Sequence, residues 1–88
     1  MKATSMGLKN FVRQLFGILP DAEIAAAVEQ RLVDAFGDRV SDLEVTVSDR
    51  QVVLTGRCRD IAIKQRAMTE ALSITGVRGV INEIRVDL

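Results

Sequence analysis

The chain has no histidine, tryptophan or tyrosine, only one cysteine and one proline, and no net charge across its 88 residues. Histidine is the commonest general base and the usual activator of a nucleophilic serine or cysteine, and no other nucleophile with a recognisable base takes its place. The single Cys58 excludes an intramolecular disulfide, and its position in an expected strand predicts a small buried residue. We therefore expect a protein that is not an enzyme and carries no cofactor.

Aromatic residues make up only 3% of the chain, so few side chains are available to stack on nucleic-acid bases. The sequence Gly76-Val77-Arg78-Gly79 matches the GxxG loop of KH domains, in which a helix follows the loop. Here a β-branched segment follows it, and the chain is neutral overall. We expect no nucleic-acid partner.

The chain also lacks a long apolar run. No segment approaches the roughly 20 apolar residues of a membrane-spanning helix, and Lys9, Asn10 and Arg13 interrupt the apolar region that a secretory signal requires. Hydrophobic residues at 48% and charged residues at 27% are typical of a soluble globular chain of this size. We expect one small domain in the cytoplasm, or peripherally attached at the inner face of a membrane.

The charges are distributed unevenly along the sequence. Residues 1–20 carry three bases and no acid, residues 21–49 carry eight acids and two bases, and residues 50–88 carry seven bases and four acids. The three segments therefore have net charges of +3, −6 and +3. Such polarity can orient a domain on a partner or on a charged surface.

Residues 1–20 form an expected N-terminal extension with the periodicity of an amphipathic helix. Its apolar residues recur at spacings of three and four and are Leu8, Phe11, Val12, Leu15, Phe16 and Leu19. Pro20 ends this segment, because the residue before a proline is disfavoured in the α region. The apolar side chains could bind a partner protein, lie on an anionic membrane, or fold back over their own domain.

Residues 21–88 are predicted to form one α+β domain with the order α-β-β-α-β. Helices are expected over about 21–36 and after Asp60, with Asp21 and Asp60 as N-caps and with Gly37 and Gly76 as terminators. Alternation predicts strands at 43–48, 52–58 and 79–86, with a tight turn at 49–50. The expected core side chains of the sheet are Val45, Val47, Val52, Leu54, Ile84 and Val86. Those of the second helix are Ile63, Ala67, Ala71 and Leu72.

Three motifs in this order resemble the BON domain family. They are Asp21-Ala22-Glu23-Ile24, the pair Val45-Thr46-Val47 and Val52-Val53-Leu54-Thr55-Gly56, and Gly76-Val77-Arg78-Gly79-Val80-Ile81-Asn82-Glu83-Ile84. The resemblance covers about residues 21–88. It implies a three-stranded sheet with both helices on one face, and a bacterial, non-catalytic module that contacts proteins, phospholipid or small ions. Gly56 and Gly76 match glycines of the family and are expected to be structural, through a close helix-to-sheet approach and a helix C-cap respectively.

Two groups of residues are the candidate sites within this domain. The outer sheet face is predicted to present Val53 and Ile81 beside Arg57 and Arg85, a mixed patch that suits contact with a protein or with another copy of the chain. An alternative function is binding of a cation, either potassium or calcium, or of an anionic phospholipid surface. Weak candidates for cation ligands are the acids near the first helix-to-strand loop, namely Asp34, Asp38, Asp42 and Glu44.

Overall fold

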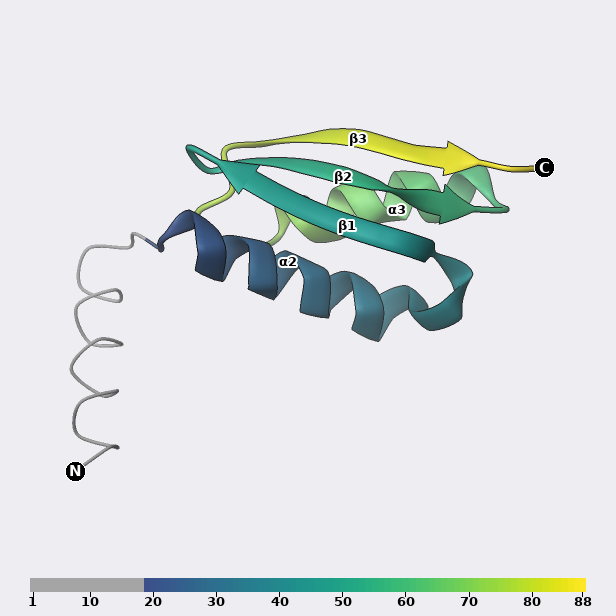
Figure 1. Cartoon of the computed structure of the whole chain (residues 1–88), viewed down its shortest axis with the longest axis horizontal. Coiled ribbons are helices and arrows are strands. Elements are labelled where there is room, and N and C mark those ends of the chain that lie inside the picture. The colour runs from purple at the N-terminus through teal and green to yellow at the C-terminus, as the bar shows by residue number, and fades with distance from the viewer. Residues whose placement is uncertain (1–18) are drawn as a thin grey trace, which may run out of the picture.

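The structure is a computed structural model that describes residues 19–88. Helix α2 (Asp21–Phe36) leads through a short 3-10 turn, η1 (Gly37–Arg39), into strand β1 (Ser41–Ser48). Strand β2 (Gln51–Cys58), helix α3 (Ile61–Leu72) and strand β3 (Gly79–Val86) follow. This order confirms the predicted α-β-β-α-β sequence of elements, and both helices lie on the same face of the sheet (Figure 1).

The sheet has the order β1-β2-β3, with β2 in the centre. A two-residue turn joins β1 to β2, so these strands are antiparallel, with Val47 opposite Val52. Strand β3 instead runs parallel to β2, because α3 carries the chain back to the other end of the sheet before β3 begins. The sheet is therefore mixed, and β1 and β3 are its two edges.

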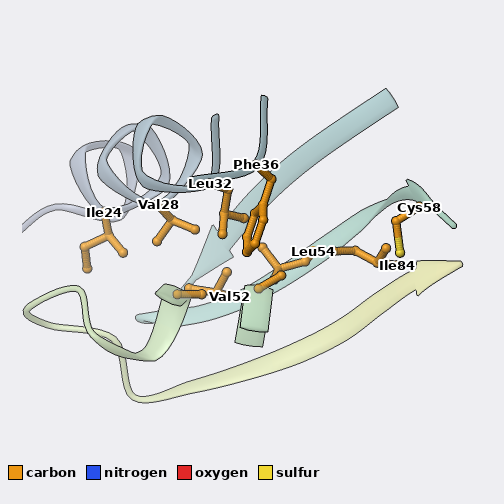
Figure 2. Close-up of a cluster of buried hydrophobic side chains, with 10 residues drawn as sticks. Ile24, Val28, Leu32, Phe36, Val52, Leu54, Cys58 and Ile84 are labelled. Carbon is orange, nitrogen blue, oxygen red and sulfur yellow. The ribbon is translucent and has the colours of Figure 1, made fainter. Parts of the chain in front are cut away.

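The hydrophobic core lies between the sheet and the two helices (Figure 2). Its buried members are Ile24, Val28, Leu32, Phe36, Val52, Leu54, Cys58, Ala67, Ala71 and Ile84. The predicted strand register is confirmed, since Val52, Leu54 and Ile84 are buried on this face. The other three predicted core residues of the sheet, Val45, Val47 and Val86, are half-buried and pack against the same cluster.

Helix α3 differs from its predicted form at the C-terminal end. The helix ends at Leu72, where Ser73 bonds back to the last turn, so Gly76 lies in the following loop and is not a C-cap. Leu72 is 47% exposed and does not belong to the core, contrary to the prediction. Gly76 has a φ of 96°, and a Cβ there would lie 3.3 Å from Ile24 Cδ1, so the glycine permits close approach of this loop to α2.

Gly56 is also structural for a different reason from the one predicted. A Cβ at this position would lie 3.0 Å from the carbonyl oxygen of Ser41 and 3.3 Å from Leu43 Cα. The close neighbour is therefore the backbone of β1 and not a helix. The register of β1 shifts between Ser41 and Glu44, and Asp42 has a φ of 54°, which indicates a bulge opposite the glycine.

The carboxylate of Asp21 joins the start of α2 to the β1–β2 turn. Asp21 was expected to be the N-cap of α2, but Pro20 occupies that position. The Asp21 side chain instead accepts hydrogen bonds from the backbone N–H groups of Asp49 and Arg50, at 2.8 and 2.9 Å. These two residues have φ values of 50° and 63°, the sign that a type I′ turn requires. The charged acceptor stabilises a turn that lacks the usual glycine.

We expect Asp21→Ala to lower the free energy of unfolding by about 1–3 kcal/mol, because two N–H groups lose a charged acceptor. Chemical denaturation followed by circular dichroism measures this change. Asp34→Ala is the matched control, since Asp34 is an exposed acid of the same helix whose one hydrogen bond within residues 19–88 comes from Gln30. Equal stability of the two variants would contradict a role for Asp21 in holding the turn.

Candidate interaction surface

The face of the sheet opposite the helices is not covered by any element that the structure describes, and we call it the open face. Its side chains alternate with those of the core and are Glu44, Thr46, Ser48, Val53, Thr55, Arg57, Ile81, Glu83 and Arg85. Ile81 is 43% exposed, and Val53, directly opposite it on β2, is half-buried. The four predicted contact residues of the sheet, Val53, Ile81, Arg57 and Arg85, therefore lie on one surface.

Arg57 and Arg85 lie directly opposite each other on neighbouring strands, near the end of β2 and β3. Like charges in this arrangement repel. Asp87 partly compensates, because its carboxylate is 2.9 Å from Arg57 Nε and 3.8 Å from Arg85 Nη2. One acid between two arginines leaves this end of the open face positively charged. Both arginine side chains are more than half exposed, so their ion pairs add little to stability.

An open groove of about 740 Å³ adjoins this end of the sheet. Its lining residues are Asp38, Arg39, Ser41, Arg57, Cys58, Arg59, Ile63, Asp87 and Leu88. Arg39 is engaged with the end of α2, because it donates to the carbonyl oxygens of Ala35 and Phe36. Arg59, in contrast, is exposed and makes no hydrogen bond or ion pair with any residue from 19 to 88. We call Arg57, Arg59 and Arg85 the arginine cluster.

Neither Arg59 nor the groove was predicted from the sequence. Arg57 lies on β2 and Arg59 directly follows that strand, and a spacing of two places both on the same side of an extended chain. That spacing was a usable signal. The position of Asp87 beside Arg57, by contrast, depends on the parallel pairing of β3 with β2, which the sequence does not show.

The predicted cation ligands do not come together. Asp34 lies on α2 and accepts a hydrogen bond from Gln30, whereas Glu44 points outward from β1 on the open face. Asp38 and Asp42 belong to η1 and to the bulge of β1. Within residues 19–88, no three acidic or cysteine side chains are close enough together to hold a metal ion. The fold therefore does not assemble these four acids into a cation site.

Most of the predicted extension lies outside the described residues. This applies to Leu8, Phe11, Val12, Leu15 and Phe16, so their predicted contacts remain predictions. Leu19 is described, and it is half-buried and packs against the core of its own domain. In the described part of the chain, no helix is both long and apolar enough to cross a membrane.

Two helices on one face of a three-stranded mixed sheet, with the other face open, define a small α+β domain of the α-β-β-α-β type. The BON domain model matches residues 20–87, and the chain belongs to the BON domain family. The resemblance inferred from the three motifs is thereby confirmed. Membership of this family indicates a non-enzymatic interaction module.

A solved structure shares this fold. It is the C-terminal domain of CdsD, described as the structural protein of the type III secretion system of Chlamydia trachomatis, with a TM-score of 0.66 and 22% sequence identity. The similarity covers 80% of the present chain and 35% of the CdsD chain, so the present chain matches only about a third of that protein. No curated protein matches the sequence.

Proposed function

We propose that this BON domain is a protein-interaction module that associates with a second copy of itself through the open face. The observation that carries the proposal is the side of the sheet that no element within residues 19–88 covers, where Ile81 and Val53 form an apolar centre between charged side chains. A protein interface commonly has this arrangement, with an apolar core inside a polar rim. The two helices already cover the other side of the sheet, so association through the open face leaves the core undisturbed.

Two further observations support a copy of the same chain as the partner. The open face carries charges of both signs, Glu44 and Glu83 with Arg57 and Arg85, so another copy can supply opposite charges. The CdsD domain with the same fold belongs to a protein that is described as structural in a secretion system. A module that builds contacts between chains is consistent with both features.

Ile81→Glu is expected to weaken self-association at least tenfold, on the order of 1.4 kcal/mol or more, because it places a charge at the apolar centre of the interface. Size-exclusion chromatography with light scattering over a concentration series measures the change. Leu72→Glu is the matched control, since Leu72 is similarly exposed at 47% against 43% but lies on α3. This control should associate like the unaltered chain.

A wild-type chain that stays monomeric at high concentration would contradict the proposal. If that monomer sedimented with vesicles of anionic phospholipid, and salt released it, the result would favour the lipid-binding alternative. Self-association that Ile81→Glu and Leu72→Glu weaken equally would instead assign the contact to another surface.

A further inference from the structure

We infer that copies of this chain associate head to tail, with the outer side of α2 of one copy against the arginine cluster and open face of the next. The inference rests on the proposed function, because it names the partner surface for the same open face. The open face carries Glu44 and Glu83, but its arginines gather at one end of β2 and β3, whereas exposed acids lie on the outer side of α2. This local difference in charge favours a contact between the two surfaces.

The arginine cluster is the receiving surface. Arg57 and Arg85 are opposite each other in the sheet, and Arg59 lies in the adjoining groove, whose lining also includes Asp38 and Asp87. The carboxylate of Asp87 forms ion pairs with both Arg57 and Arg85. The guanidinium of Arg59 has no partner among residues 19–88, and it is available to a carboxylate from outside the domain.

The outer side of α2 has the complementary properties. Glu29 and Asp34 are exposed there, and Val33, between them in the sequence, is 48% exposed. Arg31 is the basic residue of α2, but its Nε lies 2.6 Å from Oε1 of Glu70 on α3. Its charge is therefore paired with Glu70 and not with the exposed acids of α2. The exposed side of α2 is therefore acidic with an apolar residue at its centre.

The two surfaces cannot meet within one copy, because α2 and the open face lie on opposite sides of the sheet (Figure 1). Carboxylates of α2 therefore find the unpaired positive charge on a neighbouring chain, where Val33 also meets the apolar pair Val53 and Ile81. A contact between two different surfaces is heterologous. A pair of copies keeps one free surface of each kind, so the association continues to a closed ring or an open row.

Charge reversal tests this arrangement in the full chain. Variant A carries Arg59→Glu and Arg85→Glu, and variant B carries Glu29→Lys and Asp34→Lys. Each variant alone presents like charges on both surfaces and is expected to self-associate at least about tenfold more weakly than the wild type. An equimolar mixture of A and B restores opposite charges at every contact and should recover the wild-type molar mass by light scattering. The recovered association should weaken as salt is added.

Arg50→Glu with Arg66→Glu is the matched control for variant A. It changes the net charge equally but alters bases at the β1–β2 turn and on α3, and circular dichroism verifies that each variant is folded. The control should associate like the wild type. Variants A or B that associate normally, or folded variants whose mixture fails to recover assembly, would overturn the head-to-tail contact while leaving self-association standing. A wild-type chain that is monomeric at all concentrations would overturn both.

Discussion

Gly56→Ala is expected to lower the free energy of unfolding by about 2–5 kcal/mol, a large share of the roughly 5–15 kcal/mol that stabilises a domain. Two costs combine. The φ of Gly56 is 154°, a conformation that side chains rarely adopt, and the new Cβ would lie 3.0 Å from the Ser41 carbonyl oxygen. Because that neighbour is backbone, relief requires β1 to move away from β2.

Gly79→Ala provides the control for this substitution. Gly79 is also a strand residue, but a Cβ there would meet nothing within 4 Å, and its φ lies outside the range that disfavours side chains. Denaturant unfolding monitored by circular dichroism should find Gly79→Ala within about 1 kcal/mol of the wild type. Two equally stable variants would show that the approach of β1 to β2 is not as tight as the structure indicates.

Leu54→Ala is expected to cost about 2–5 kcal/mol of unfolding free energy, the range for truncating a large buried side chain and leaving a cavity. Leu54 is completely buried on the central strand, and Figure 2 shows it between α2 and the sheet near Phe36 and Ile84. Neither neighbouring strand nor α2 can close the space without losing its own contacts. The melting temperature should fall, and the far-UV spectrum of the folded protein should stay the same.

Leu72→Ala is the control for Leu54→Ala, because it removes the same atoms from a side chain that is 47% exposed. We expect a cost below about 1 kcal/mol, since much of that side chain is already in contact with water. A comparable loss in the two variants would indicate that α3 continues beyond Leu72 and buries it, as the helical spacing predicts.

Local periodicity was sufficient to predict the elements and the direction of their side chains. Successive strand residues point to opposite faces, so the alternation in residues 43–48 and 79–86 alone separated the core side from the open face. The same reasoning placed Ile81 and Arg85 on one surface. The helical spacing wrongly assigned Leu72 to the core. Leu72 fits the spacing of the buried residues, but spacing alone does not show whether the sheet covers the last turn of the helix.

The acidic candidates show where sequence proximity misleads. Asp34, Asp38, Asp42 and Glu44 lie within eleven residues of one another in the sequence, yet they belong to a helix, a 3-10 turn, a bulge and a strand. Each element directs its side chains differently, and no three of these acids come close enough together to hold a metal ion. A cation site requires convergence, and that property depends on the orientation of the elements.

The sequence by itself determined the order of the elements, the two faces of the sheet and the membership of the BON family, because these depend on short-range spacing and on motifs. Only the tertiary structure decided that Asp21 holds a turn 28 and 29 residues away, that Gly56 faces the backbone of β1, and that Asp87 lies between two arginines. The physical reason is that each of these contacts joins elements whose relative placement follows from packing around a common core. Hydrophobic burial brings those elements together but is not directional, so only the folded arrangement shows which polar groups meet.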